Sequence, residues 1–403
     1  MPSVRPQGNE SDPRPPGEAL APAVPAGKDR IRLEFLDGMR GLAALYVVWT
    51  HCTAEGRLGG SSRLETIFAS VGRYGHVTVC VFIVLSGFCL ALPVSRSDDH
   101  RLEGGLPGFV KRRARRILPP YYAALILAVA VTALLHHHAA WWIRSSREHE
   151  LSMASLATHA LMVHNLSPWF FSISPPLWTV ATEWQIYFIY GLIMIPLWNR
   201  LGSTVAGIFA IACGIGMHYG LNGGLNIDAA CPWFLALFGM GVLASEVVFA
   251  RSDAARALRK LPAGPLALAV ALAYLVFPSV LAGRAQLHSV MIQDMASGTL
   301  ALFILIYCGV QRVENRGNWL TRVFESRLSM FLGAMSYSLY LTHYCVVDSL
   351  VVALKPTGIG PTAGVLLFYA VGIPAAVGLS YAFYLRFEKP FVRAAQRKPR
   401  PAS

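Results

Sequence analysis

The sequence predicts an all-α fold, a polytopic membrane bundle of about ten transmembrane helices. Hydrophobic residues make up 54% of the 403 residues and charged residues only 14%, whereas an average soluble domain is about 25% charged. A helix crosses the bilayer with roughly 20 apolar residues, and apolar stretches of about this length alternate with short polar breaks from Leu36 onward. The ten expected spans are residues 36–54, 76–94, 119–136, 178–198, 203–218, 231–249, 264–282, 295–312, 333–353 and 362–385.

The distribution of Lys and Arg predicts the orientation of this bundle. With ten spans and a cytoplasmic N-terminus, 27 of the 35 basic residues fall in cytoplasmic segments and 7 in outer segments. Cytoplasmic loops collect Lys and Arg, so we expect a multi-pass protein of the cell membrane with both termini in the cytoplasm. The net charge of +13 is then explained by the orientation of the protein in the membrane. Nucleic acid is not expected as a partner, because the chain has no soluble domain and no aromatic stacking surface.

Three segments are expected to lie outside the spans. Residues 1–30 contain seven prolines and few large apolar residues, so they cannot bury enough surface to fold and are expected to form a disordered cytoplasmic tail. Residues 392–403 are expected to form a disordered basic tail. Residues 152–166 are moderately apolar and are interpreted as a re-entrant or interfacial piece that stays on one side. The membrane domain is therefore expected to cover residues 31–391.

The first span carries an unusual set of ionisable residues. A charged side chain at bilayer depth costs about 2.5–3.5 kcal/mol, so such residues are rare and usually functional. Asp37 and Arg40 are three residues apart and can pair on one helix face. His51 follows Arg40 by eleven residues, which returns it to within roughly 20° of the same direction, about 16 Å further along the axis. The stripe is expected to line a cavity; the alternative is an ion pair at the membrane edge with His51 at the outer end.

Two later spans also hold polar side chains. Glu183 lies in the outer third of the fourth span, with Trp178 and Tyr187 as aromatic neighbours. In the ninth span His343 falls near mid-membrane, six residues after Tyr337. Each of these residues is a candidate for the site, and the alternative for each is a satisfied polar residue between helices.

Two other motifs favour structural roles. Ser86 is a candidate nucleophile, but the GxSxG elbow is absent, so close helix packing at Ser86 and Gly87 is the default interpretation. The run His136–His138 has no acidic or cysteine partners spaced around it. A solvated interface is therefore preferred there, and no metal site is expected.

A basic run precedes the third span. Five of the six residues from Lys111 to Arg116 are basic. Such a run anchors the cytoplasmic side and binds anionic lipid. If the run is helical, Arg113 and Arg116 share a face and can clamp phosphates together, with Arg112 beside them. Composition alone leaves both interpretations open.

In this order, the motifs resemble the acyltransferase 3 family of multi-pass membrane enzymes, which move acyl groups onto hydroxyls. The resemblance covers residues 32–391, which are then an acyltransferase 3 membrane domain. Single motifs are weak, but the ordered set is specific. The motifs are Leu36-Asp37-Gly38-Met39-Arg40-Gly41 with His51, Leu85-Ser86-Gly87-Phe88, Arg112-Arg113-Ala114-Arg115-Arg116-Ile117-Leu118-Pro119, Leu177-Trp178 with Glu183 and Tyr187, Ser336-Tyr337-Ser338-Leu339-Tyr340-Leu341-Thr342-His343, and Glu388-Lys389-Pro390.

This resemblance implies ten helices and an acyl-CoA donor that approaches from the cytoplasm. It implies essential roles for Arg40, for His51 and for the pair Arg113 and Arg116. Many relatives carry an additional C-terminal hydrolase-like domain, and the chain is expected to be a stand-alone form without it. The expected reaction moves an acyl group, most simply acetyl, from acyl-CoA as co-substrate to a hydroxyl of a glycan or another small molecule. No bound cofactor is expected.

The expected mechanism places His51 at its centre. Arg113 and Arg116 hold the CoA phosphates, and His51 acts as general base on the acceptor hydroxyl. A carboxylate would position His51, with Glu183 preferred over Asp37. Alternatively, His51 carries the acyl group transiently. Arg40 organises the site or stabilises developing negative charge.

Two alternatives to the glycan acyltransferase remain. One is an enzyme of the same class that acylates a macrolide or polyketide, for which the sequence holds no distinguishing feature. The other is a secondary transporter, which also has many helices and buried charges. A transporter is expected to show discontinuous helices in matching halves, and the sequence shows no such halves.

Overall fold

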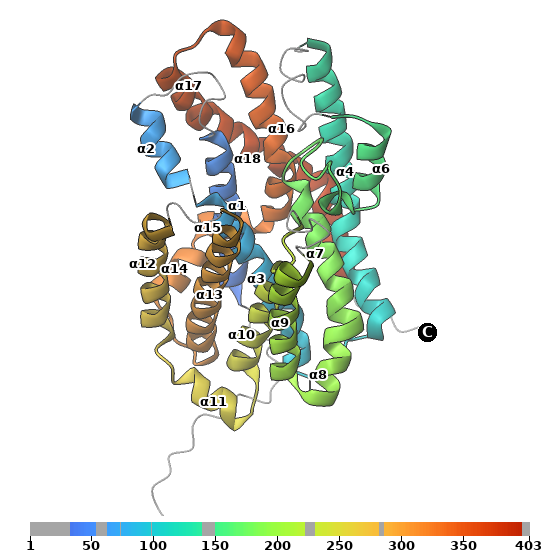
Figure 1. Ribbon diagram of the computed structural model, residues 1–403, viewed down its shortest axis with the longest axis vertical. Helices are drawn as coiled ribbons and strands as arrows, with labels where there is room; N and C mark the ends of the chain where they lie inside the picture. The colour runs from blue at the N-terminus through green and yellow to red at the C-terminus, as the bar shows by residue number, and fades with distance from the viewer. Residues whose placement is uncertain are drawn as a thin grey trace, which may run out of the picture. The chain divides into compact units, whose positions relative to one another are not determined.

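The computed structural model describes residues 33–53, 63–72, 74–97, 99–138, 150–221, 230–281 and 286–396. Within these residues every regular element is a helix and no strand occurs, so the all-α prediction is confirmed (Figure 1). The chain divides into two units, Met1–Arg32 and Leu33–Ser403. The tail expected over residues 1–30 lies outside the described residues.

Each of the ten predicted spans coincides with helical structure. Among the described residues, seven helices are long and apolar enough to cross a membrane, or eight if the bent pair α10 and α11 is counted as one span. The chain is therefore a polytopic membrane protein. The helices are α1 (Glu34–Cys52), α3 (Gly75–Ser95), α4 (Gly105–His138), α7 (Leu177–Ile189) continuing through the π-helical η3 (Tyr190–Met194) into α8 (Ile195–Leu201), α9 (Ser203–Leu221), α10 (Phe234–Phe249), α12 (Ala263–Leu281), α13 (Gln286–Val313), α16 (Ser336–Leu354), and the consecutive segments α17 (Pro361–Leu367), η6 (Phe368–Gly372), α18 (Ile373–Phe383) and η7 (Tyr384–Glu388).

Shorter helices connect these elements. They are α2 (Arg63–Gly72), α6 (Met153–Ala160), η2 (His164–Leu166), α11 (Asp253–Arg259), α14 (Trp319–Phe324), α15 (Arg327–Ala334), η5 (Lys355–Thr357) and α19 (Lys389–Gln396). With eight and three residues, α6 and η2 are too short to cross a bilayer, as expected for residues 152–166. Helix α19 extends into the segment 392–403 that was expected to form a disordered tail. The first residues of that segment are therefore helical, as far as Gln396.

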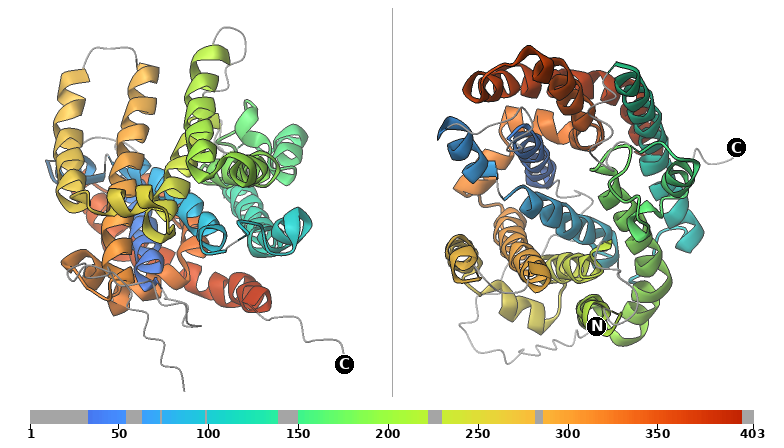
Figure 2. Two further views of the ribbon diagram at one scale, coloured as in Figure 1. Left: turned by 90° about the horizontal axis from the view of Figure 1, so that it is seen from below. Right: turned by 45° about the horizontal axis from the view of Figure 1, so that its top comes forward.

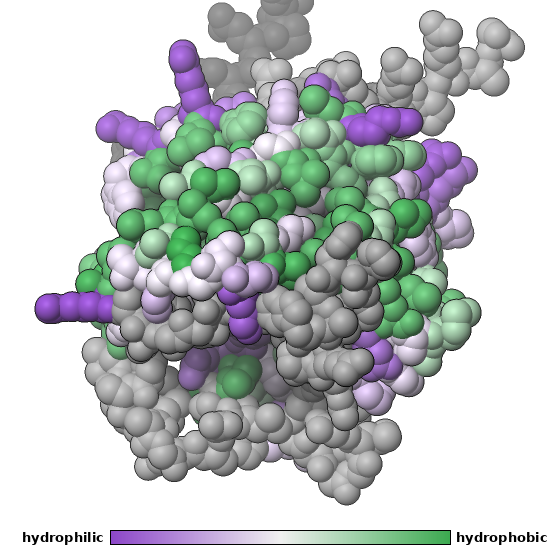
Figure 3. Space-filling model, turned by 90° about the horizontal axis from the view of Figure 1, so that it is seen from above, coloured by the Kyte–Doolittle hydropathy of each residue, from purple (hydrophilic) through white to green (hydrophobic). Residues whose placement is uncertain are grey.

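The surface carries the apolar side chains that a membrane requires. Figure 3 shows a hydrophobic band across one face, with most hydrophilic side chains along its margins. Large apolar side chains point outward on α4, α9 and α12, among them Ile126, Ile208 and Leu268. Lipid tails are as apolar as these side chains, so this outward display is stable in a bilayer.

Helices α1 and α3 lie at the centre, surrounded by later parts of the chain (Figure 2, right). Glycines allow α1 to pack tightly against the α14–α15 segment. A side chain at Gly38 would overlap the backbone carbonyl of Phe324, and one at Gly41 would overlap the backbone of Gly333. Small residues at such contacts let backbones approach closely in membranes. The first half of α1 is therefore held in position by backbone contact.

Helix α3 is held in the same way by α10. A side chain at Gly87 would overlap the carbonyl of Phe238, and one at Gly241 would overlap the carbonyl of Val84. Close packing at Gly87, the default interpretation of the Ser86-Gly87 pair, is therefore observed.

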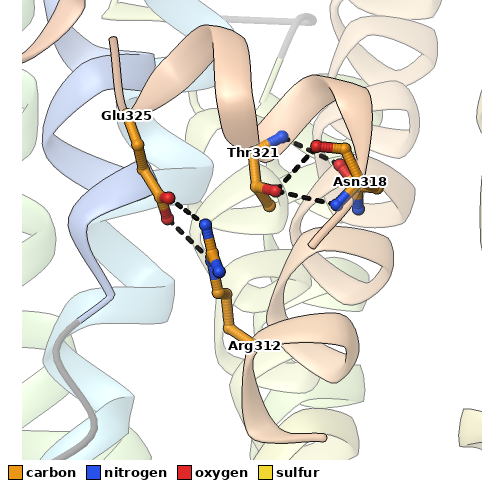
Figure 4. A network of polar contacts seen from close by, with 4 residues as sticks. All are labelled: Arg312, Asn318, Thr321 and Glu325. Carbon is orange, nitrogen blue, oxygen red and sulfur yellow. Dashed lines mark hydrogen bonds and ion pairs between the residues drawn. The ribbon is translucent and has the colours of Figure 1, made fainter. Parts of the chain in front are cut away.

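A polar network fixes the segment that supports α1 (Figure 4). The Arg312 guanidinium, at the end of α13, donates to both carboxylate oxygens of Glu325. Asn318 and Thr321 form a reciprocal capping box at the start of α14. Bidentate pairs of this kind fix geometry as well as charge. The network therefore orients α14, and with it the Phe324 carbonyl that contacts Gly38.

Two histidines are buried outside the spanning helices. His159 of α6 and His164 of η2 are both fully buried, and their rings stack with centroids 3.9 Å apart. Burial lowers the pKa of the His164 imidazole to about 3, and the neighbouring His159 adds to the shift. Burial also lowers the pKa of His159. Both rings are therefore neutral in the folded state at neutral pH.

We expect Gly41→Ala to lower the Tm of the detergent-solubilised protein. Overpacking of this kind costs about 1–3 kcal/mol or more, because the new methyl group meets the backbone of Gly333. Gly378→Ala, at a helical position with open space around it, is the matched control and is expected to leave the Tm unchanged or raise it. Equal thermal shifts for the two variants would contradict the account of α1 packing.

We also expect α6 and η2 to open as the pH falls. The pKa of His164 is lower in the folded state than its ordinary value of about 6.5. The stabilisation is therefore complete above that pH and is lost as the pH falls toward 3. At pH 5 the cost reaches about 2 kcal/mol. The protection factors of residues 153–166 against hydrogen exchange, which correct for the pH dependence of intrinsic exchange, should fall between pH 7 and pH 5, and His164→Gln should reduce that fall. A fall in protection that is identical in wild type and variant would argue against this assignment.

Candidate active site

Two adjacent cavities lie between α1, α3, α7 and α16. The first, of about 230 Å³, is called the arginine cavity here. The second, of about 580 Å³, is called the aromatic cavity. Val79 and Tyr340 line both cavities, so they form a shared partition. The arginine cavity includes Arg40, Ser86, Arg113, Arg116, Glu183 and Tyr187. The aromatic cavity includes His51, His76, Phe170, Phe171, Trp178 and Trp233.

Arg40 enters the arginine cavity from α1. Its guanidinium lies 3.3 Å from the Asp37 carboxylate, as the spacing predicts, and 3.1 Å from the Cys89 sulfur. The Arg40 side chain is 18% exposed and that of Asp37 is 48% exposed. Asp37 therefore lies at the rim of the bundle, whereas the Arg40 guanidinium lies deeper inside it.

The basic run is helical, because α4 begins at Gly105. Arg113 and Arg116 both line the arginine cavity, with Arg113 half-buried and Arg116 exposed. Arg112 instead donates to the carbonyl oxygen of Glu103, at 2.6 Å. With Arg40, three guanidinium groups converge on one cavity. Guanidinium groups suit bidentate recognition of phosphate and carboxylate.

Glu183 forms the polar wall of the same cavity. Its Oε1 accepts hydrogen bonds from the Ser86 hydroxyl and, at 2.5 Å, from the Tyr187 hydroxyl. Tyr337 also lines this cavity, and its hydroxyl donates to the Ile117 carbonyl at 3.2 Å. Ser86 is therefore a hydrogen-bond donor to the Glu183 carboxylate.

His51 is held by a second imidazole. Nδ1 of His51 lies 2.8 Å from Nε2 of His343, and Nδ1 of His343 lies 2.9 Å from the carbonyl oxygen of Leu339. A carbonyl oxygen only accepts, so in neutral His343 the proton lies on Nδ1 and Nε2 accepts. His51 must then donate from Nδ1. Its Nε2 consequently carries the lone pair, as a base or nucleophile requires.

The partition between the cavities is ordered by hydrogen bonding. The hydroxyls of Tyr340 and Thr179 lie 2.6 Å apart, and Phe82 packs edge-on against the Tyr340 ring. Tyr340 is thereby fixed at the point where the two cavities meet.

The aromatic cavity also contains a pair that the sequence analysis missed. Nε2 of His76 lies 3.0 Å from Oδ2 of Asp294, and the Trp233 indole donates to the same oxygen at 2.7 Å. Trp178 lies over His76 with nearly parallel rings, 6.4 Å between centroids. His76 is the first residue of the predicted span 76–94, and Asp294 directly precedes the predicted span 295–312. A histidine and a carboxylate beside apolar spans were therefore the feature of the sequence that could have identified this pair.

The structure thus divides the sequence-predicted residues between two chambers. Arg40, Arg113, Arg116, Glu183, Ser86 and Tyr337 meet in the arginine cavity. His51 and Trp178 line the aromatic cavity. Nδ1 of His51 is held by His343, where a carboxylate, Glu183 or Asp37, was expected. Glu183 lies with Ser86 and Tyr187, and Asp37 with Arg40.

Comparison with known proteins identifies the family of the chain. A family model described as an acyltransferase domain matches residues 33–385, nearly the whole membrane unit. No curated protein and no solved structure matches the sequence. Because the family model covers far more than half of the chain, the chain belongs to the acyltransferase 3 family and is a membrane acyltransferase.

Proposed function

We propose that the protein transfers a short acyl group from acyl-CoA to a hydroxyl of a glycan. The observation that supports this most is the pair of cavities that meet at Val79 and Tyr340. One cavity offers cationic groups that suit a phosphate-bearing donor. The other presents a histidine whose Nε2 carries a lone pair and offers aromatic faces for the acceptor. The partition is where donor and acceptor meet.

The arginine cavity is the donor side of this proposal. The exposed Arg116 and the half-buried Arg113 lie on one face of α4, and Arg40 lies deeper. A cavity of about 230 Å³ is too small for a nucleotide. The CoA phosphates therefore bind at the mouth, to Arg116 and Arg113, and the pantetheine arm enters. A short acyl group such as acetyl then reaches the partition. The excess of Lys and Arg in the expected cytoplasmic loops supports a mouth that opens to the cytoplasm, with both termini on the same side of the cell membrane.

His51 is the reacting residue on the acceptor side. The bond from the acyl carbon to the CoA sulfur breaks, a new bond forms to the acceptor oxygen, and the hydroxyl proton ends on the CoA thiol. Nε2 of His51 serves as the base that takes the proton, or it takes the acyl group itself and passes it on. Both routes need the lone pair that His343 directs to Nε2.

The lining of the aromatic cavity favours a ring-shaped acceptor. Trp178, Phe170 and Phe171 present aromatic surface, which packs against the apolar face of a sugar ring while polar groups recognise its hydroxyls. An apolar macrolide would also pack against these rings. Glycan acylation is proposed first, because His51, His76 and Thr50 supply polar atoms to the same cavity.

The proposed function is tested with purified full-length protein and radiolabelled acetyl-CoA, with and without candidate glycans. We expect acetyl-CoA-dependent transfer by the wild type and a loss of about 10²–10⁴-fold in His51→Ala, the usual contribution of an acid–base group. His100→Ala, at an exposed position after α3, is the control and should keep its activity. If the wild type neither binds nor consumes any acyl-CoA, the proposal is wrong.

A comparison of three arginines tests the donor site. Arg113→Ala and Arg116→Ala should each raise the KM for acetyl-CoA about 10- to 100-fold, because a hydrogen bond to a charged group is worth about 1.5–3 kcal/mol. Arg112→Ala removes a neighbour of equal charge that binds the Glu103 carbonyl, and its KM should stay near the wild-type value. A uniform effect across the three variants would show that only net charge matters.

The His343 pair tests how His51 is positioned. His343→Leu removes the acceptor for Nδ1 of His51 and should lower kcat by at least about tenfold. His343→Gln keeps an oxygen that can accept this proton, so it should recover part of the loss with little change in the KM for acetyl-CoA. Full activity in His343→Leu would contradict the positioning role.

A further inference from the structure

The aromatic cavity contains a second imidazole, His76, to which the proposed function gives no chemical step. His76 is the second residue of α3, and its side chain is 42% exposed and lines the aromatic cavity. Asp294, on α13, is only 2% exposed and lies 3.0 Å from Nε2 of His76. A carboxylate buried this deeply in a membrane protein, and paired with a histidine that faces a cavity, is a candidate for function.

The hydrogen bonds fix which nitrogen of His76 is basic. The Asp294 carboxylate accepts from the indole of Trp233 at 2.7 Å and from His76, both at Oδ2. Nε2 of neutral His76 is therefore the protonated nitrogen, and Nδ1 carries the lone pair. The pairing resembles the aspartate–histidine pair of hydrolytic triads with the two ring nitrogens exchanged; in those triads the aspartate sets the tautomer and stabilises the imidazolium that forms.

His76 also stands beside His51. Their chain neighbours Gly75 and Thr50 are in such close contact that a side chain at Gly75 would overlap the Thr50 side chain. Both histidines line the same cavity. An acceptor hydroxyl in that cavity therefore has one imidazole on α1 and another on α3 in the lining around it.

We propose that His76, held by Asp294, is the base that activates the acceptor hydroxyl, and that His51 carries the acyl group. This inference rests on the proposed function and assigns its two half-reactions. In the first, Nε2 of His51 attacks the thioester carbonyl, the carbon–sulfur bond breaks, and CoA leaves as a thiolate that takes up a proton from water. In the second, Nδ1 of His76 takes the hydroxyl proton, the acceptor oxygen attacks the acyl carbon, and the bond to His51 breaks with its electron pair returning to Nε2. His76 then releases its proton to water.

A metal site is the competing interpretation of the same cluster. His76, Cys80 and Asp294 offer ligand atoms that all lie within 4.8 Å of one another, in the part of the chain that the structure describes. The distance of 3.0 Å between Nε2 of His76 and Oδ2 of Asp294 fits a hydrogen bond, and two ligands of one metal ion can lie about as close. The base assignment is argued from the hydrogen bond, and the metal is an outcome that the test distinguishes.

The test compares nucleophiles that do and do not need a base. Purified full-length protein is given radiolabelled acetyl-CoA and one of three acceptors: hydroxylamine, a methyl glucoside or water alone. Hydroxylamine attacks acyl groups at neutral pH without deprotonation, whereas the sugar hydroxyl and water need a base. His76→Asn, Asp294→Asn and His51→Ala are measured beside the wild type, each in the presence and absence of EDTA.

In His76→Asn we expect the ratio of transfer to hydroxyl acceptors over transfer to hydroxylamine to fall at least tenfold. Asp294→Asn should lower the same ratio, because the neutral amide keeps an oxygen for Trp233 and His76 but no longer stabilises the imidazolium that forms when His76 takes up the proton. His51→Ala should lose transfer to all acceptors together.

The other outcomes overturn the inference in distinguishable ways. An unchanged ratio in His76→Asn, or an equal loss with every acceptor, means that His76 is not the base. The inference is also contradicted if the wild type transfers acetyl to hydroxylamine but neither hydrolyses acetyl-CoA nor acetylates the glucoside. Activity lost with EDTA and restored by zinc would identify the cluster as a metal site. If the wild type consumes no acetyl-CoA with any acceptor, the proposed function itself fails.

Discussion

The placement of α1 is the constraint on which the rest of the site depends. Its polar residues would be costly in lipid, so the helix must lie inside the bundle, and Gly38 and Gly41 let it approach the α14–α15 segment closely enough to do so. The Arg312–Glu325 pair holds that segment in turn. Once α1 is fixed, Arg40 and His51 lie about three helical turns apart along one axis, and the two cavities follow from that separation.

The two cavities differ in the side chains that line them, so the two ends of the site differ in chemistry. Arg40 of α1 and Arg113 and Arg116 of α4 line the arginine cavity, whereas the imidazoles of His51 and His76 line the aromatic cavity. Tyr340 and Val79 stand between them. In the proposed enzyme this separation keeps the CoA phosphates at the mouth while only the acyl end reaches His51.

Most helices could be predicted from the sequence, because apolar runs and basic breaks are local properties. The stripe on α1 and the shared face of Arg113 and Arg116 follow from helical periodicity in the same way. The contacts that organise the histidines could not be predicted. His51 and His343 are 292 residues apart, and His76 and Asp294 are 218 apart, so their pairing depends on how α1, α3, α13 and α16 pack. The preference for Glu183 as the partner of His51 assumed a single chamber, whereas α7 places Glu183 and Trp178 in different ones.

The most direct test of the account is a structure of the protein with a non-hydrolysable acetyl-CoA analogue, in which a ketone replaces the thioester. We expect the phosphates to contact Arg113 and Arg116, and the carbonyl carbon to lie at the partition of Val79 and Tyr340, facing Nε2 of His51. An analogue whose phosphates bind away from α4, or whose carbonyl group remains beside Glu183 without reaching His51, would contradict the transfer route between the two cavities.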